Sequence, residues 1–418
     1  MHYALPILKK GLYNMHHHSK QKKSNKLFSF VVIILLLIIA IKSINGTPSS
    51  GEGPESPSAD HDAVCFVVGN VANSPAPDFS NENFEETVKD VFTATPLDKK
   101  PNVCMYSATA NPYSIEIASK YIEKKDHNQA NQQGQIKRLI KGINEAAKTS
   151  PSEGGANYYE AIMRAASYLK GTGAESPLII VYGSGLSDTG IVNFAFDGLL
   201  SKDEKYITGR ISDSNIRQND YGRTSLIWYG AGQTLTTNGQ LPLSQSLINK
   251  TENIYIAALS YVGISMNPKS INISDTTTSV ATDYWVNPTI VPGELKPGYK
   301  FSLNANIAKF DKNTANLINY DEVKDILSEF AKNFNDTTGV RIKLTGYQTK
   351  CGEGKGTQLS IDRATVIRNI LSELHVDTSK ITVNGVDGPQ DDREEIPYCG
   401  DTGVAVEHRT VILEVLED

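Results

Sequence analysis

The sequence predicts two folded domains, one α/β and one α+β, that follow a single membrane helix. Three observations support this fold class. A 15-residue apolar run at 27–41 is flanked by Lys26 and Lys42. Short apolar strands alternate with helical periodicity over residues 63–264, which favours a doubly wound parallel sheet with helices on both faces. Residues 301–418 then follow the order β-α-β-α-β-β, with two amphipathic helices.

The N-terminal end predicts a membrane anchor. Residues 1–26 contain six lysines and no acidic residue, which predicts a cytoplasmic N-terminus. The apolar part of residues 27–42 is shorter than the ~20 residues that cross a bilayer as a helix, but the flanking lysines can snorkel. A cleaved signal peptide is the alternative, because its apolar core has a similar length. Since no small-x-small cleavage site follows, we favour a single-pass signal-anchor in a bacterial cell membrane, with most of the chain extracytoplasmic.

Composition argues against several function classes. The net charge is −6, and outside the N-terminal tail the basic residues form no strong patch, which argues against nucleic-acid binding. The apolar span holds no ionisable residue, which argues against an ion-conducting stator.

Residues 43–62 are rich in Gly, Pro, Ser and Glu and predict a flexible linker. Residues 265–300 are polar and are assigned as a connector between the two domains.

The first domain shows a regular alternation of elements. Its strands are predicted at 63–69, 102–107, 178–182 and 226–229, and its helices at 113–124, 135–148, 158–169 and 247–262. This order resembles the von Willebrand factor A-like fold, a doubly wound domain with a metal site at the carboxyl ends of its strands. The resemblance covers residues 63–264 and rests on the order of the elements.

The positions that would hold that metal are altered. The family uses an Asp-x-Ser-x-Ser run, a Thr and a second Asp, whereas Mg²⁺ here would meet mostly neutral oxygens and lack its usual carboxylate. We therefore expect no metal and no other cofactor. Because ligands bind at this edge of open α/β sheets, the same loops are predicted to recognise a protein partner. The residues concerned are Asn70, Asn73, Asn157, Ser184 and Asp188.

No enzyme motif is complete in this chain. Ser184 follows a predicted strand, but Gly183 and Gly185 lack the spacing of a hydrolase nucleophile elbow. The same run lacks the third glycine of a dinucleotide-binding loop. Outside the N-terminal tail, the histidines are scattered and show no metal-ligand spacing. We expect a binding protein and not an enzyme.

The last domain carries the most specific pattern in the sequence. A Gly-Tyr-Gln-Thr strand end at 346–349 precedes a Gly-rich loop, and Leu-Ser-x-x-Arg-Ala at 359–364 then opens a helix. Arg409 lies just before the final predicted strand. This pattern resembles the OmpA-like peptidoglycan-binding family over all of residues 301–418. In that family an Asp and an Arg clamp the amine and the carboxylate of a diamino acid in the wall peptide.

The resemblance implies a ligand-binding set of Tyr347, Thr349, Arg363 and Arg409. Arg363 matches the family's arginine, and a guanidinium suits a carboxylate because it donates two parallel hydrogen bonds. Thr349 replaces the family's Asp and offers the ligand's amine only a neutral hydroxyl. The clamp is thus predicted to have lost its acidic half.

The four cysteines agree with an exported chain. In an OmpA-like fold, the loops that hold Cys351 and Cys399 could lie close together. We therefore predict a disulfide between Cys351 and Cys399, which closes about 49 residues and would contribute roughly 4 kcal/mol. Cys65 and Cys104 each lie in an apolar strand of the first domain, where they either pair or remain small buried side chains.

The anchor, the linker and the C-terminal motif together predict a cell-envelope protein. We expect its last domain to bind peptidoglycan non-covalently and its middle domain to bind an unidentified protein partner. The alternative is an envelope scaffold that makes protein contacts only, because both inherited sites are degenerate. No nucleic-acid partner is expected.

Overall fold

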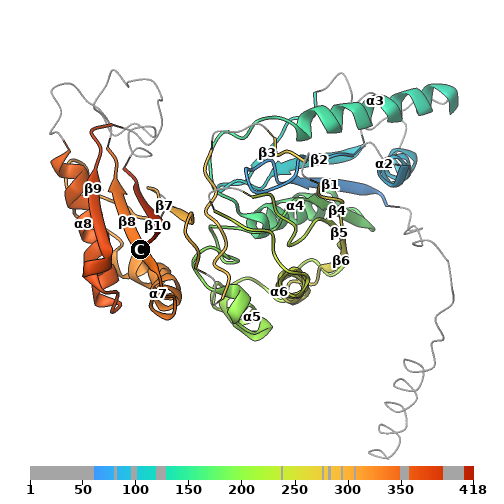
Figure 1. The fold of residues 1–418 in the computed structure, drawn as a ribbon. Helices are drawn as coiled ribbons and strands as arrows, with labels where there is room; N and C mark the ends of the chain where they lie inside the picture. Colours follow the sequence, from blue (N-terminus) through green and yellow to red (C-terminus); the bar gives the residue numbers. More distant parts are fainter. Residues whose placement is uncertain are drawn as a thin grey trace, which may run out of the picture. The chain divides into compact units, whose positions relative to one another are not determined.

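The structure is a computed structural model of the 418-residue chain (Figure 1). It describes residues 61–79, 82–95, 101–118, 129–236, 239–274, 277–280, 284–292, 295–305, 307–348, 357–388 and 409–418. The predicted tail, the anchor and all but the end of the linker lie outside these residues, as do Thr349, Cys351 and Cys399. Within the described residues, no helix is both long and apolar enough to cross a membrane.

The first domain contains a six-stranded sheet with the strand order β3-β2-β1-β4-β5-β6 (Figure 1). The strands are β1 (Ala63–Val68), β2 (Asn102–Ser107), β3 (Tyr113–Ser114), β4 (Pro177–Tyr182), β5 (Ser225–Tyr229) and β6 (Ser265–Lys269). All neighbours pair in parallel except β2 and β3. The predicted doubly wound parallel sheet is therefore confirmed, with an antiparallel strand added at one edge.

Helices cover both faces of this sheet (Figure 1). The even-numbered residues of β1 pack with α2 (Glu82–Ala94) and α3 (Gln129–Ala147), and the odd-numbered residues pack with three other helices. These three are α4 (Tyr158–Thr172), α5 (Glu204–Asp213) and α6 (Gln245–Tyr261). Alternation along a strand places successive side chains in opposite cores, as expected for a sheet buried on both sides.

Two predictions for this domain were wrong. Residues 113–124 were predicted to be a helix, but in the described part of this range, residues 113–118, β3 pairs with β2 and the alternating Ile115 and Ile117 are buried against the sheet. Residues 119–124 lie outside the described residues. Residues 265–269 were assigned to the connector, but they form the edge strand β6. Its sequence, Ser-Met-Asn-Pro-Lys, lacks an apolar run and contains a proline, which is tolerated at a sheet edge.

A disulfide joins Cys65 and Cys104, which face each other across β1 and β2. The structure thus selects one of the two alternatives that the sequence left open for these cysteines. The bridge ties together two neighbouring parallel strands at the centre of the first domain.

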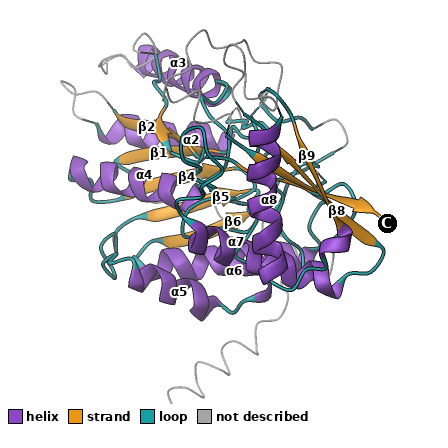
Figure 2. Cartoon of the chain, turned by 90° about the vertical axis from the view of Figure 1, so that its left-hand side faces the viewer, coloured by secondary structure: helices purple, strands orange, loops and turns teal. Residues whose placement is uncertain are grey.

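The second domain contains a four-stranded sheet with the order β7-β10-β8-β9. Its strands are β7 (Lys300–Leu303), β8 (Val340–Gly346), β9 (Ile381–Gly385) and β10 (Val411–Glu417), and its helices are α7 (Tyr320–Asp336) and α8 (Gln358–Glu373). Strand β10 runs antiparallel to both of its neighbours, and β8 is parallel to β9. Helix α8 packs across β8 and β9 (Figure 2). The predicted β-α-β-α-β-β order is confirmed.

Described residues of the connector contact both domains, and the connector and the two domains belong to one compact unit, Ala59–Asp418. The Asn287 backbone N–H donates a 2.8 Å hydrogen bond to Oδ2 of Asp188 in the loop after β4. The Asn287 side chain bonds the backbone N–H and the carbonyl of Ser302 in β7. Ile290 and Leu295 enter the apolar core of the second domain. The connector therefore links loops of the first sheet to an edge strand of the second.

Candidate functional site

The first turn of α8 lies directly against the ends of two strands of the second sheet. A Cβ at Gly346, the last residue of β8, would lie 1.9 Å from the Ser360 carbonyl oxygen. A Cβ at Gly385, the last residue of β9, would lie 2.6 Å from the Thr357 carbonyl oxygen. Glycine at both positions permits this close approach. The packing fixes where Arg363, less than one helical turn after Ser360, enters the domain.

Arg363 is buried, with an exposed fraction of 2%. Its Nε donates a 3.1 Å hydrogen bond to the Thr314 carbonyl oxygen, and its guanidinium lies 5.5 Å from the centre of the Phe310 ring. Burial, together with the positive charge of Arg409, lowers the pKa of Arg363 to about 10, so it remains charged at neutral pH. Among the described residues, no acidic side chain forms an ion pair with Arg363.

Arg409 and Tyr347 lie at the same end of the sheet. Nη1 of Arg409 donates a 3.3 Å hydrogen bond to the carbonyl oxygen of Phe310, the residue that stacks on Arg363. The Tyr347 backbone N–H donates a 2.8 Å hydrogen bond to the Thr410 carbonyl oxygen. Burial raises the pKa of Tyr347, so its phenol remains neutral. Arg363 and Arg409 are thus brought together beside Phe310, whereas the charged neighbours of the Tyr347 phenol are Lys300 and Glu414.

A hairpin at residues 310–317, which sequence patterns did not reveal as part of the site, contacts both arginines. Its ends are joined by an antiparallel bridge between Phe310 and Leu317. The polar residues between them indicate a turn. However, no pattern connects that turn to Arg363, which is 49 residues away from Thr314. Guanidinium groups are donors only, so the arginines beside this hairpin are suited to an anionic group such as a carboxylate.

The carboxyl edge of the first sheet contains a crevice that is filled by a neutral tyrosine side chain. The strand order reverses direction between β1 and β4, which is where open α/β sheets bind ligands. The Tyr158 hydroxyl fills this crevice, since a Cβ at Gly69 or Gly183 would lie 1.9 or 2.4 Å from it. This hydroxyl shares a hydrogen bond with Ser74. Burial raises the pKa of Tyr158, so the crevice holds a neutral phenol.

Three of the predicted recognition side chains are buried here and hydrogen-bonded within the edge itself. Ser184 Oγ donates to Asn73 Oδ1 over 3.3 Å, and Asn73 Nδ2 donates to the Leu186 carbonyl oxygen over 3.1 Å. Asn70 accepts a 2.5 Å hydrogen bond from Ser107 and donates one of 2.8 Å to a backbone carbonyl. The sequence correctly predicted that these three residues lie at the carboxyl edge of the first sheet. Their side chains, however, form hydrogen bonds that join the loops to one another.

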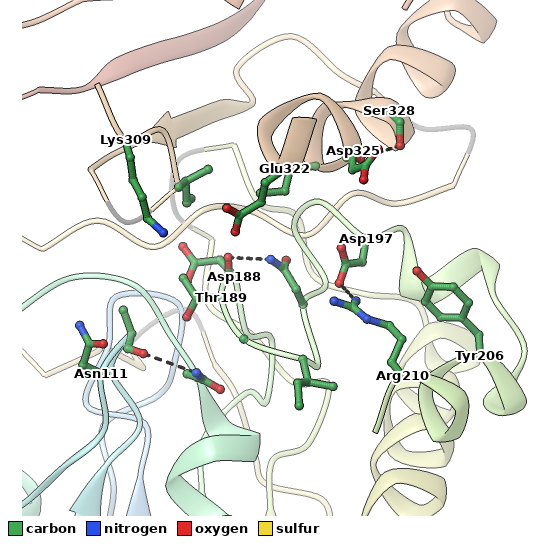
Figure 3. Close-up of a pocket in the computed structure, with 17 residues that line it drawn as sticks. Asn111, Asp188, Thr189, Asp197, Tyr206, Arg210, Lys309, Glu322, Asp325 and Ser328 are labelled. Carbon is green, nitrogen blue, oxygen red and sulfur yellow. Dashed lines mark hydrogen bonds and ion pairs between the residues drawn. The ribbon is translucent and has the colours of Figure 1, made fainter. Parts of the chain in front are cut away.

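The other two predicted recognition residues line a cavity of about 1120 Å³ (Figure 3). Asn157 caps α4 by accepting a 3.3 Å hydrogen bond from the Glu160 backbone N–H. The two carboxylate oxygens of Asp188 accept backbone N–H groups of Ala156 and Asn287 at 2.7 and 2.8 Å. Burial raises the pKa of Asp188 to about 6, and backbone hydrogen bonds oppose the shift.

Charged side chains of both signs line the rest of this cavity (Figure 3). Lys309, Glu322 and Asp325 belong to the second domain, whereas Arg210 and Asp197 form an ion pair in the first. In the described part of the chain, no three His, Cys, Asp or Glu side chains are grouped closely enough to hold a metal ion.

No protein-family model matches this sequence, and no curated protein matches it. The chain is similar to solved structures over a minor part of its length. One is the periplasmic domain of Helicobacter pylori MotB, with 14% identity and a TM-score of 0.25, covering 31% of this chain and 89% of that chain. Another is the peptidoglycan-associated lipoprotein from Burkholderia pseudomallei, with 18% identity, a TM-score of 0.22, and coverages of 26% and 87%.

A third is the OmpA-like domain of FopA1 from Francisella tularensis, with 20% identity and a TM-score of 0.22. It covers 28% of this chain and 72% of that chain. TM-scores this low support no conclusion about function, which depends on the residues described above.

Proposed function

We propose that this chain is a cell-envelope protein whose residues 301–418 bind peptidoglycan non-covalently. The observation that supports this most is the cationic end of the second sheet, where Arg363 and Arg409 meet beside the hairpin at 310–317. Wall peptides carry carboxylates, and a guanidinium binds a carboxylate through two parallel hydrogen bonds. The OmpA-like sequence pattern favours the same class of ligand.

The proposal includes the location of the chain. Residues 27–42 would anchor it in a bacterial cell membrane, with the basic tail in the cytoplasm and the folded domains outside. The disulfide between Cys65 and Cys104 supports export, because disulfides persist mainly in oxidising compartments.

We also propose that residues 63–264 bind a protein partner near the wall. Of the loops predicted to recognise it, those that hold Asn157 and Asp188 line an open cavity. The cavity is therefore where we expect the partner to make contact. Asn70, Asn73 and Ser184, which are buried, would instead maintain the shape of the neighbouring loops.

Co-sedimentation of the full chain in mild detergent with insoluble peptidoglycan tests wall binding. Arg363→Lys keeps the charge but loses the planar pair of donors, so we expect its Kd for the wall to rise by about tenfold. Arg341→Lys is a matched control. Arg341 is exposed at the opposite end of β8, where its Nε donates to the Glu417 carbonyl oxygen.

Equal binding by the wild type and Arg363→Lys would contradict wall binding through this site. Failure of the wild type to sediment would instead favour a second candidate, an envelope scaffold that makes protein contacts only. The internal hydrogen bonds of Asn70, Asn73 and Ser184 are the observation that favours this candidate. Sedimentation velocity over a range of protein concentrations would then measure self-association.

A further inference from the structure

Charged side chains of the second domain face the cavity of about 1120 Å³ without a partner of opposite charge. Lys309, Glu322 and Asp325 line this cavity and are exposed, and none of them forms an ion pair with another described residue. Figure 3 shows the side chains of Lys309 and Glu322 pointing toward the loop that holds Asp188 and Thr189. The cavity therefore offers free charged groups to a ligand.

These unpaired charges are mostly negative. The ion pair on the first-domain wall of the cavity cancels its own charge. Glu322 and Asp325 then outnumber Lys309, and the buried Asp188 adds a further negative charge at neutral pH, because its pKa is about 6. Charges in a cavity are screened by water less than charges on an open surface. The cavity is therefore expected to attract a positively charged ligand.

The hydrogen-bonding groups of the cavity favour the same kind of ligand. Thr189 already donates its hydroxyl hydrogen to the Ala156 carbonyl oxygen over 3.2 Å, so its oxygen can only accept. Asn111 Nδ2 donates to Glu153 over 3.0 Å, and the Asn111 side-chain oxygen accepts from no described residue. Together with the two free carboxylates of α7, these oxygens are acceptors, which the N–H groups of an ammonium or a guanidinium would satisfy.

The Glu322 carboxylate is held in position by the side chain of Asn319. Asn319 Nδ2 donates a 2.8 Å hydrogen bond to Oε2 of Glu322 and one of 2.9 Å to the Ile307 carbonyl oxygen. Asn319 Oδ1 accepts the Lys309 backbone N–H at 2.9 Å, so one amide positions residues of opposite charge. Oε1 of Glu322 accepts from no described residue and remains for a ligand. An acceptor fixed in advance loses less conformational entropy on binding.

We propose that this cavity binds a segment of the protein partner that carries two basic side chains, through Glu322 and Asp325. The inference rests on the proposed partner binding and specifies the chemistry of that partner. The two acids are three residues apart in α7 and so lie on the same face of the helix. Arginine suits them best, because its planar guanidinium donates two parallel hydrogen bonds to a carboxylate. The cavity is also larger than a single side chain requires, since pockets of about 300–1,000 Å³ hold whole small ligands.

Isothermal titration calorimetry of the full chain in mild detergent, with three blocked tripeptides, tests this proposal. The probes are acetyl-Arg-Gly-Arg-amide, acetyl-Gln-Gly-Gln-amide and acetyl-Glu-Gly-Glu-amide, which differ in charge and are similar in size. We expect the arginine peptide to bind about tenfold more tightly than the glutamine peptide, and the glutamate peptide not to bind. Equal binding of the three peptides, or binding of none, would overturn the inference.

Three substitutions of exposed residues locate the binding site. Glu322→Gln keeps an acceptor for Asn319 but removes the charge, so the Kd of the arginine peptide should rise about fivefold. Lys309→Gln removes a like charge and should lower that Kd about twofold. Asp336→Asn is a matched control, because it makes the same change in net charge at the last residue of α7, outside the cavity.

The control variant should bind the arginine peptide as the wild type does. Equal effects of Glu322→Gln and Asp336→Asn would mean that the peptide responds only to net charge, and would overturn the site. Weaker binding by Lys309→Gln would also contradict it. Circular dichroism identifies any variant that does not fold, and the wild-type order of the three peptides remains a test by itself.

Competition with a soluble wall stem peptide distinguishes a protein partner from the wall as the source of the positive charge. The stem peptide should not displace the arginine peptide, and displacement would overturn the assignment to a protein. These outcomes are separable from wall binding. If the wild type sediments with peptidoglycan but binds the three peptides alike, wall binding stands and the inference is wrong. If it does not sediment but binds the arginine peptide through Glu322, wall binding is wrong and the inference stands.

Discussion

The two sheets of this protein each carry a polar site at one end, and the two sites differ in charge. At the carboxyl edge of the first sheet, Asn73, Ser184 and Tyr158 are neutral and hydrogen-bonded within the protein. At the end of the second sheet, Arg363 and Arg409 are positively charged, and Arg363 has no acidic ion-pair partner among the described residues.

The difference in charge leads us to expect ligand binding at the end of the second sheet and not in the Tyr158 crevice at the edge of the first. Neutral polar groups satisfy one another when they are buried, so little driving force remains for an outside partner. A buried guanidinium without a counter-charge is unfavourable, and an anionic ligand relieves that cost. We therefore expect the first edge to act as structure and the second as a binding site.

The largest expected effect tests whether the disulfide stabilises the first domain without affecting ligand binding at the second sheet. Replacing Cys65 and Cys104 by alanine opens a loop with a sequence separation of 39 residues. We expect the free energy of unfolding to fall by about 4 kcal/mol. Denaturant unfolding measures this loss, and co-sedimentation with peptidoglycan under native conditions should not change. A loss below about 1 kcal/mol would contradict a stabilising role for the disulfide.

Asp188 is the one buried acid at the edge of the first sheet that we predicted to be functional, and it gives a pH signature. Its folded pKa of about 6 lies above the unfolded value, so the folded state holds the proton more tightly. Stability should therefore decrease as pH rises from about 4 to about 6, by roughly 2–3 kcal/mol, and then level off. Thermal unfolding across this range measures the effect.

Asp188→Asn should remove that pH-dependent component, because the amide does not titrate. The same loss of stability between pH 4 and pH 6 in this variant would show that other groups produce it.

A smaller effect tests whether the hydrogen bond of Tyr158 to Ser74 stabilises the carboxyl edge of the first sheet. Tyr158→Phe removes the hydroxyl that bonds Ser74, and we expect a loss of about 1–2 kcal/mol in unfolding free energy. Tyr159→Phe is a matched control, since the buried Tyr159 hydroxyl has no hydrogen-bond partner among the described residues. It should change stability little or raise it. Equal losses in the two variants would contradict a specific role for the Tyr158 hydroxyl.

The sequence predicted the strands whose apolar runs are buried on both faces, such as β1 and β4. It missed β6 because the residues of this edge strand are exposed or half-buried and form no apolar run. It also missed α5, which buries only Ile207 and Ile211, too few positions to show a helical period.

For the site, the Leu-Ser-x-x-Arg-Ala motif was enough to locate Arg363. The contacts of Phe310 and Thr314 with it depend on how a hairpin folds back onto α8, which no local pattern records. No sequence pattern predicted that the Tyr158 hydroxyl would fill the crevice at the carboxyl edge of the first sheet. Its hydroxyl fits because Gly69 and Gly183, on two different strands, leave the necessary space.

Hydrogen–deuterium exchange of the full chain, with and without soluble wall stem peptides, tests the contrast between the two sheets most directly. The account predicts slower exchange in the hairpin at 310–317, in the first turn of α8 and around Arg409. It predicts no change around Asn73, Tyr158 and Ser184. Protection confined to the first sheet, with none near Arg363, would contradict it.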